Sequence, residues 1–173
     1  SDGAAALGRT DASTAGSMPG RVSIAARCQV NDYLPMSKRD LLYFEGCARA
    51  WSGAMSTAGI TLDDLDLVET HDCFTVAELM QYEAMGLTPP GQGATAALSG
   101  LTAKDGKLPV NRSGGLKSKG HPIGATGVSM HVMTAMQLTG TAGDLQLPNA
   151  EIGGVFNMGG VAVANYCSIL KAG

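Results

Sequence analysis

The chain has 173 residues, of which 45% are hydrophobic and 16% are charged, a composition typical of a folded domain with one sizeable core. Its net charge of −3 and its scattered lysines and arginines exclude the basic face that nucleic acid binding requires. The sequence has no C-x-x-C pair and no apolar run of about 18 residues, so it predicts free thiols, no membrane span and a cytoplasmic setting.

The first twenty residues differ in composition from the rest of the chain. Ser1 to Leu7 is typical of the end of a buried strand, whereas Gly8 to Gly20 is polar and rich in glycine, serine and threonine. Either the chain is a fragment or residues are missing around Leu7 and Gly8. We therefore expect residues 1–20 to be the incomplete end of a preceding domain with its linker, and residues 21–173 to be one folded domain.

Two elements follow the linker. Residues 21–28 alternate between apolar and polar positions, which predicts a strand. From Ser37 onward the apolar residues recur at spacings of three and four, which predicts a core-facing helix with Ser37 as its N-cap and Gly59 as its end. Trp51 falls on the apolar side of this helix, so we expect it to pack in the core.

The next predicted strand leads directly into a helix. Residues 65–70 predict the strand, and the helix is expected from Thr75 to about Met85. His71 and Cys73 then lie at the strand-to-helix junction, and in an open α/β sheet ligands bind at the carboxyl ends of the strands. A thiol near a helix N-terminus also has its thiolate favoured. A buried, inert cysteine and half of a metal site remain as alternatives, although the lack of other nearby cysteines or histidines disfavours zinc.

The C-terminal half completes a layered α/β pattern. Residues 91–107 predict a loop, residues 108–111 a short strand and residues 123–138 a helix. Residues 151–157 and 161–170 predict two strands joined as a hairpin, with glycines in the connecting turn. The alternation of strands and helices predicts an α/β domain with a mixed five-stranded sheet.

A glycine-rich stretch, residues 111–127, runs into the last predicted helix. Pro122 suits a first helical turn, so we expect His121 at a helix N-terminus, where free N–H groups favour an anion or a developing oxyanion. Lys117 and Lys119 add positive charge nearby. A P-loop is excluded because His121 stands where that motif requires lysine, and no G-x-G-x-x-G occurs. The alternative is an ordinary glycine-rich connection with a surface histidine.

Three separated motifs occur in order along the chain: His71-Asp-Cys-Phe74, Gly120-His-Pro-Ile-Gly-Ala-Thr-Gly127 and Asn157-Met-Gly-Gly160. Together they resemble the C-terminal domain of thiolases, and specifically the branch similar to sterol-carrier-protein-linked thiolases. The resemblance covers roughly residues 21–170, and residues 1–7 resemble the last strand of the family's N-terminal domain. The fold that it implies is the thiolase-like layered α/β domain.

Thiolases form or cleave a carbon–carbon bond between acyl groups carried on coenzyme A, using one nucleophilic and one proton-moving cysteine. The resemblance implies that Cys73 is the proton-moving acid and base, because Asn157 stands where most thiolases carry that cysteine. It implies that His121 activates the nucleophile and donates to the enolate oxyanion, and that His71 holds a water or the substrate oxygen. Gly159 would donate its N–H in a second oxyanion hole.

Binding roles and partners also follow from the resemblance. Asn157, Ser118, Gly120 and Phe74 are expected to contact the substrate or the coenzyme. Coenzyme A and acyl-CoA enter as substrates, and neither a permanent cofactor nor a metal is implied. The nucleophilic cysteine is expected on the family's N-terminal half, outside these residues, so that half is an expected partner. A homodimer or homotetramer is expected as well, and a small partner protein accompanies some bacterial relatives.

The resemblance therefore predicts an acyl-CoA C-acyltransferase of the thiolase type, incomplete as this chain alone. Cys28, Cys47 and Cys167 fall within predicted strands or a helix, so we expect them to be buried and not to replace the nucleophile. Two alternatives remain. One is a thiolase-like subunit of a partner-dependent C-acyltransferase or aldolase complex, and the other is a non-catalytic module that binds coenzyme A or lipid. Retention of both Cys73 and His121 favours thiolase chemistry.

Overall fold

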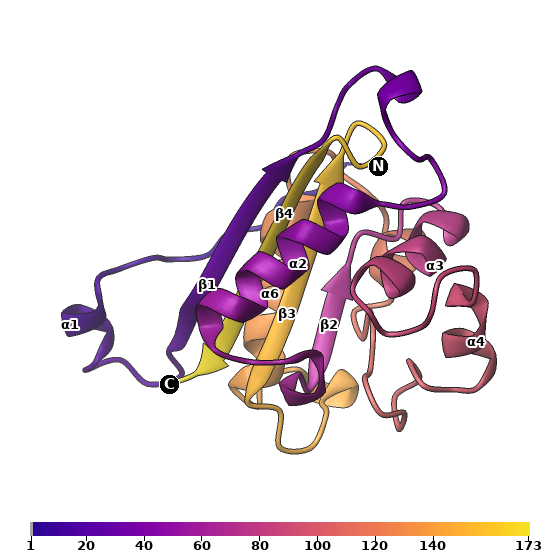
Figure 1. The fold of residues 1–173 in the computed structure, drawn as a ribbon. Coiled ribbons are helices and arrows are strands. Elements are labelled where there is room, and N and C mark those ends of the chain that lie inside the picture. Colours follow the sequence, from indigo (N-terminus) through magenta and orange to yellow (C-terminus); the bar gives the residue numbers. More distant parts are fainter. Residues whose placement is uncertain (1) are drawn as a thin grey trace.

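The computed structural model describes residues 2–173, which form a domain around one four-stranded sheet with the strand order β1-β4-β3-β2 (Figure 1). Ser1, the first residue of the strand expected at the N-terminus, lies outside the described residues. The strands are β1 (Val22–Asn31), β2 (Leu67–Thr70), β3 (Ile152–Gly159) and β4 (Ala164–Ala172). β4 is antiparallel to both β1 and β3, whereas β2 runs parallel to β3, so the sheet is mixed as predicted.

The prediction of a fifth strand at residues 108–111 was wrong. This segment makes a single parallel bridge, between Val110 and Val68, in which the Val68 N–H donates to the Pro109 carbonyl at 3.0 Å. Pro109 has no N–H to extend a ladder, and Asn111 turns the chain away with a left-handed φ of 52°. The segment therefore ends as a bridge beside β2.

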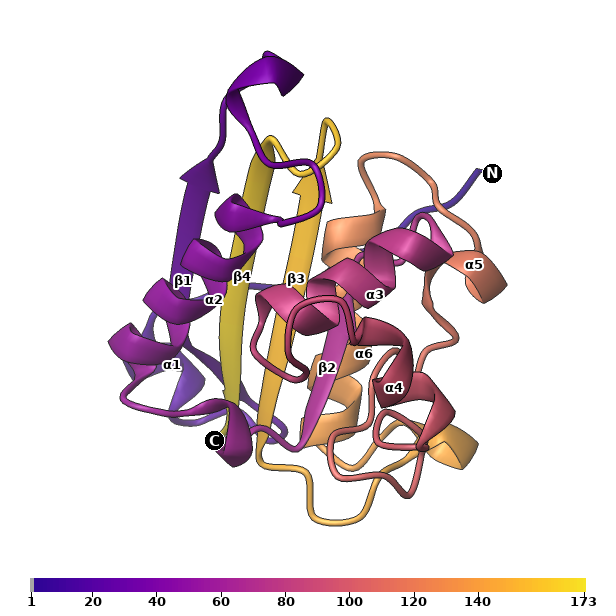
Figure 2. The same ribbon diagram turned by 45° about the vertical axis from the view of Figure 1, so that its right-hand side comes forward.

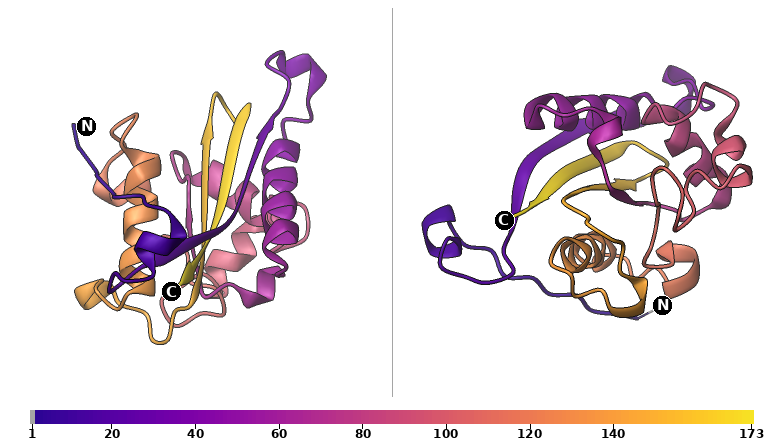
Figure 3. Two further views of the ribbon diagram at one scale, coloured as in Figure 1. Left: turned by 90° about the vertical axis from the view of Figure 1, so that its left-hand side faces the viewer. Right: turned by 90° about the horizontal axis from the view of Figure 1, so that it is seen from below.

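Helices cover both faces of the sheet. α2 (Glu45–Ala58) and α3 (Thr75–Ala84) pack on one face, and α6 (Thr126–Leu138) packs on the other, which gives three layers (Figure 3). A short helix, α4 (Gly93–Leu98), packs against α3 beside β2 (Figure 2). The expectation of an irregular loop over residues 91–107 missed α4.

The first long helix begins later than the sequence predicts. Only a single 3-10 turn, η1 (Met36–Lys38), forms near Ser37, and α2 begins at Glu45. Between them the Asp40 carboxylate accepts the Leu42 N–H at 2.9 Å, a local turn that competes with helical hydrogen bonding. The predicted end is confirmed, because Gly59 caps α2 in the left-handed conformation.

The remaining elements are short. Within residues 2–173 the segment 2–10 joins no strand, so the strand end expected at residues 1–7 is absent from its described part. A four-residue helix, α1 (Ala12–Ala15), follows it and is capped by the Asp11 carboxylate. The others are the 3-10 turns η2 (Leu62–Asp64) and η3 (Gly143–Leu145) and the helix α5 (Gly115–Lys119).

The β3–β4 hairpin carries an irregular connection. β3 continues to Gly159, and Gly160, Val161 and Ala162 follow with left-handed φ values of 60°, 55° and 60°. β4 therefore begins at Ala164 and not at Val161 as predicted, because three consecutive left-handed residues interrupt the extended backbone.

Two apolar cores stabilise the three layers. Trp51 on α2 is fully buried and stacks on Phe156 of β3, with 6.1 Å between ring centroids. Gly154 provides the space for this contact, because a Cβ there would lie 2.6 Å from Trp51 Cη2. On the other face, Met130 of α6 packs with the buried Leu67 among others. The interpretation of Trp51 as a core residue is confirmed.

Candidate active site

A cleft with a volume of about 1410 Å³ collects most of the residues that the motifs single out. It lies where β2 and β3 end, beside the first turns of α3 and α6. Six of the eight candidate residues line it: His71, Cys73, Phe74, His121, Asn157 and Gly159. Ser118 and Gly120 are not among the lining residues. The three motifs thus meet at one place. His71 and Asn157, which are hydrogen-bonded there, are 86 residues apart in the chain.

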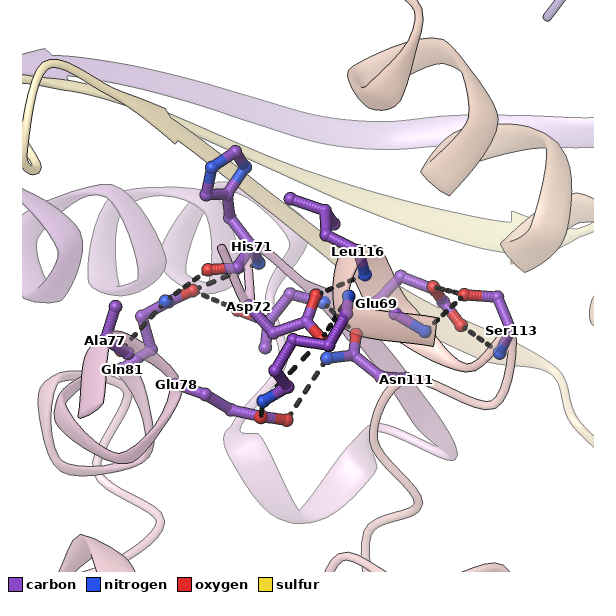
Figure 4. Close-up of polar contacts among 12 residues, drawn as sticks. Glu69, His71, Asp72, Ala77, Glu78, Gln81, Asn111, Ser113 and Leu116 are labelled. Atoms are coloured by element: carbon purple, nitrogen blue, oxygen red, sulfur yellow. Dashed lines mark hydrogen bonds and ion pairs between the residues drawn. The ribbon is translucent and has the colours of Figure 1, made fainter. Parts of the chain in front are cut away.

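Gln81 of α3 hydrogen-bonds the turn that carries His71 and Cys73. Gln81 Oε1 accepts the Thr70 hydroxyl at 2.5 Å and the His71 N–H at 3.1 Å, while its Nε2 donates to the His71 carbonyl at 2.7 Å (Figure 4). The Gln81 side chain is fully buried, and its amide group is satisfied by these bonds to the turn. Fixing both polar groups of the His71 backbone fixes the direction of its side chain.

His71 is only 5% exposed, and its Nδ1 is hydrogen-bonded to Oδ1 of Asn157 on β3. Because a carbonyl-type oxygen only accepts, this bond places the proton of the neutral imidazole on Nδ1 and leaves Nε2 as an acceptor. Burial lowers the pKa of His71, and the bond to Asn157 opposes that shift in part. Gly127 on α6 makes room for Asn157, since a Cβ there would lie 2.9 Å from Asn157 Nδ2.

His121 lies edge-on to His71, with 5.0 Å between ring centroids and 87° between ring planes. Its Nδ1 lies 2.7 Å from the Thr126 hydroxyl oxygen, and that hydroxyl donates to the Pro122 carbonyl at 3.1 Å. A hydroxyl has one proton to donate, so Thr126 accepts from the His121 Nδ1–H. The unprotonated Nε2 of His121 can therefore remove a proton from a thiol and afterwards donate it to an oxyanion.

Cys73 is half-buried between the cleft and the core. Burial raises the pKa of its thiol, and hydrogen bonds from its own and the Phe74 backbone N–H lower it in part. At neutral pH the side chain is therefore a neutral thiol, which can donate a proton. Phe74, the N-cap residue of α3, is 71% exposed at the cleft.

Buried polar side chains join β2 to the glycine-rich segment. Glu69 accepts the backbone N–H and the hydroxyl of Ser113, at 3.0 Å and 2.5 Å, and Asn111 Oδ1 accepts the Thr70 N–H at 2.8 Å (Figure 4). Burial raises the pKa of Glu69, and its bonds to Ser113 oppose that shift. Lys119 Nζ lies 3.8 Å from Glu69. The sequence predicted that Lys117 and Lys119 add positive charge near His121, and in the fold Lys119 lies beside the buried carboxylate of Glu69.

The N-terminal segment also reaches the cleft. Ala5, Leu7 and Arg9 are among its lining residues, and Gly3 lies so close to Pro122 that a Cβ would be 2.8 Å from the proline ring.

In the described residues 2–173, no group of three or more His, Cys, Asp or Glu side chains is placed to hold a metal ion. No helix in that range is long and apolar enough to cross a bilayer.

Comparison with known proteins decides the family. The family described as thiolase C-terminal domain-like matches residues 28–172. This chain belongs to that family. Acetyl-CoA acetyltransferase of Methanothermobacter thermautotrophicus is 39% identical over 140 residues, which are 80% of this chain and 37% of the relative. Human sterol carrier protein 2 is 48% identical over 102 residues, 59% of this chain and 19% of the relative. The sequence resemblance to the thiolase family and its sterol-carrier-protein-linked branch is thereby confirmed.

Two further relatives complete the comparison. Benzoylsuccinyl-CoA thiolase subunit BbsB of Thauera aromatica is 42% identical over 81 residues, 47% of this chain and 21% of the relative. A solved structure described as the Ltp2-ChsH2(DUF35) aldolase matches with a TM-score of 0.79 at 19% identity, covering 87% of this chain and 39% of that one, and establishes the mixed α/β thiolase-like fold. The chain therefore spans only about a fifth to two fifths of the length of these proteins.

Three residues of the site were assigned no role from the sequence. Gln81 is an ordinary member of a predicted helix, and its partners Thr70 and His71 lie eleven and ten residues before it. Thr126 lies inside the motif from Gly120 to Gly127, but its bond to His121 is visible only in the fold. Asp72 lies inside the motif His71-Asp-Cys-Phe74, so its position could have drawn attention, yet sequence reasoning assigned it no role.

Proposed function

We propose that this chain supplies the proton-transfer and oxyanion-binding half of a thiolase active site, which cleaves a 3-ketoacyl-CoA with coenzyme A or runs the reverse condensation. The observation that carries the proposal is the meeting of Cys73, His71 and His121 in one cleft, where each histidine has a hydrogen-bond partner that orients it. The acetyltransferase and thiolase names of the relatives support the same reaction class. We also propose that residues 1–20 are the incomplete end of a preceding domain with its linker, and that residues 21–173 form the domain described above.

Cleavage would begin when His121 Nε2 takes the proton of the nucleophilic cysteine on the other half of the protein. The thiolate attacks the ketone carbon, the bond between the α-carbon and that carbon breaks, and its electron pair forms the enolate of acetyl-CoA. Protonated His121 then donates a hydrogen bond to the enolate oxygen and keeps its proton, and the Cys73 S–H gives its proton to the α-carbon. Coenzyme A finally attacks the acyl-cysteine and passes its thiol proton to the Cys73 thiolate. The leaving nucleophilic cysteine takes back the proton that His121 holds, so all three groups return to their starting states.

His71 and Gly159 would bind oxygen atoms of the substrate. Because Nδ1 of His71 donates to Asn157, its Nε2 can only accept, so His71 would hold a water molecule that in turn donates to the thioester oxygen. Gly159 lies at the end of β3 on the cleft, and no atom lies within 4 Å of the position that a Cβ would occupy there. The thioester could therefore approach the backbone of Gly159 closely, as donation from its N–H would require.

The other half of the protein would cover the apolar part of this cleft. Ile123 is 90% exposed and Phe74 71% exposed, and both line it with Ile24, Leu41 and Val161. Large apolar side chains at such exposure mark a surface that another molecule or domain contacts. We infer that the N-terminal half and the acyl chain share this surface, with the family's dimer or tetramer forming around it.

The test is thiolysis of acetoacetyl-CoA by the full-length protein that contains this chain. The Cys73→Ala variant should lose at least about a hundredfold in kcat, as general acid–base catalysis contributes roughly 10²–10⁴-fold. Cys28→Ala is a matched control, because Cys28 is also half-buried but lies on β1 and does not line the cleft. It should leave kcat unchanged. Full activity in Cys73→Ala would contradict the assignment of the proton carrier.

A second candidate is a thiolase-like subunit that acts only with a partner protein. The Thauera aromatica relative is named as a subunit, which favours this alternative. It would be supported if the purified full-length protein were inactive alone and gained thiolase or C-acyltransferase activity when co-purified with a second polypeptide from the same host.

A further inference from the structure

We propose that Asp72 is a positioning residue, a buried strut that sets the spacing between Cys73 and His121. Asp72 is the member of the His71-to-Phe74 motif that the proposed mechanism does not use, and it is only 1% exposed. It is not among the residues that line the cleft. Its carboxylate must therefore be explained by what it holds in place, and the inference deepens the proposed function on which it rests.

The carboxylate of Asp72 binds the backbone at the start of α5. Oδ1 accepts the Leu116 N–H at 2.6 Å and Oδ2 accepts the Lys117 N–H at 3.4 Å (Figure 4). Lys117 Nζ lies 3.8 Å from the same carboxylate. Charge-assisted bonds to backbone N–H groups are about twice as strong as neutral ones, and a buried carboxylate that loses them is costly. Asp72 therefore fastens α5 to the turn that carries Cys73.

Gly115 is shaped to receive this carboxylate. Its φ is 63°, and a Cβ at this position would lie 2.1 Å from Asp72 Oδ2 and 2.6 Å from Asp72 Cγ. No side chain can occupy that space while Asp72 keeps its position. The glycine at the start of α5 thus allows the carboxylate to seat on the first two free N–H groups of the segment.

The strut spans the two halves of the site. Asp72 sits between His71 and Cys73 in the chain, and α5 ends at Lys119, two residues before His121. Proton transfer and oxyanion binding require reacting groups at near-contact distance, and a displacement of about 1 Å costs around a hundredfold in rate. A rigid link from the Cys73 turn to the segment before His121 limits that displacement.

The experiment replaces the strut in the full-length protein and measures both geometry and turnover. In Asp72→Ala we expect a crystal structure in which residues 113–121 shift relative to the β2–α3 turn, while the sheet superimposes. We expect kcat for thiolysis to fall at least about tenfold with KM changed less than about threefold, because chemistry and not binding depends on the spacing. Asp72→Asn, which keeps one acceptor oxygen for Leu116, should recover much of that loss.

Asp66→Ala is the matched control. Asp66 precedes the same strand, β2, and its carboxylate also accepts two backbone N–H groups, those of Glu151 and Ile152, both at 2.8 Å. It lies at the end of β2 away from the cleft. We expect Asp66→Ala to lower thermal stability and to leave kcat per folded molecule unchanged, which separates positioning from general structural support.

The outcomes are distinguishable. If the segment 113–121 does not move in Asp72→Ala, the proposal that Asp72 positions it is wrong, whatever the activity. The proposal is also wrong if the segment moves and kcat is unchanged. An equal loss of kcat in Asp66→Ala also overturns it. If the unmodified protein has no thiolase activity, the proposed function fails, and the crystal structures still decide whether Asp72 holds α5.

Discussion

The substitution Gly127→Ala tests how closely Asn157 packs against α6. We expect it to lower the free energy of unfolding when Asn157 is present, but not when Asn157 is replaced by alanine. In Gly127→Ala the new Cβ would lie 2.9 Å from Asn157 Nδ2, so one of them must retreat by roughly 0.5 Å to reach ordinary van der Waals contact. Overpacking costs about 1–3 kcal/mol. A disturbed bond to His71 adds about 1 kcal/mol, and replacing glycine by alanine in a helix returns up to about 1 kcal/mol.

The expected net result is a loss of about 1–3 kcal/mol in the free energy of unfolding, measured by urea denaturation of the full-length protein. In an Asn157→Ala background the obstruction is absent, so the same Gly127→Ala change should be neutral or stabilising by up to about 1 kcal/mol. The two backgrounds should therefore differ by about 1–4 kcal/mol, the coupling free energy of residues in contact. An equal loss in both backgrounds would refute the contact.

Two further predictions concern stability. Trp51→Ala should lower the free energy of unfolding by about 3–5 kcal/mol, because a fully buried indole stacked on Phe156 leaves a cavity; a loss below about 1 kcal/mol in urea denaturation would contradict the packing. Burial lowers the pKa of His71, so below about pH 6.5 the unfolded chain binds a proton that the folded chain does not, and stability falls as pH falls through the lowered pKa. The stability lost between pH 7 and 5.5 should be smaller in His71→Asn, and an identical loss in both proteins would show that His71 does not cause it.

The parts of the fold that could be predicted were those fixed by local patterns. The run of residues 65–70 followed by a helical pattern places Cys73 at the end of β2, and the glycine pattern places Asn157 near a hairpin. The late start of α2 could not be predicted, because the apolar spacing after Ser37 continues through a turn made by the Asp40 side chain. The fifth strand does not form because Pro109 lacks an N–H and Asn111 adopts a left-handed conformation, and the apolar pattern of residues 108–111 does not reveal either effect.

For the site, the reactive residue types were visible in the sequence, whereas the contacts that orient them were not. Asp72 contacts a backbone N–H 44 residues further along the chain, and Asn157 bonds a histidine 86 residues before it. Contacts between residues so far apart in the chain leave no periodic pattern in the sequence from which they could be predicted. The tautomer of His121 likewise depends on how Thr126 uses its single proton, which only the fold reveals.

The most direct test of the central claim separates the two half-reactions of the full-length protein. Exchange of labelled coenzyme A into acetyl-CoA reports acyl transfer by the nucleophile, and deuterium uptake into the acetyl methyl group in D₂O reports proton movement at the α-carbon. We predict that Cys73→Ala retains the first exchange and loses the second. Deuterium uptake at the unmodified rate in Cys73→Ala would contradict the claim that this chain supplies the proton carrier.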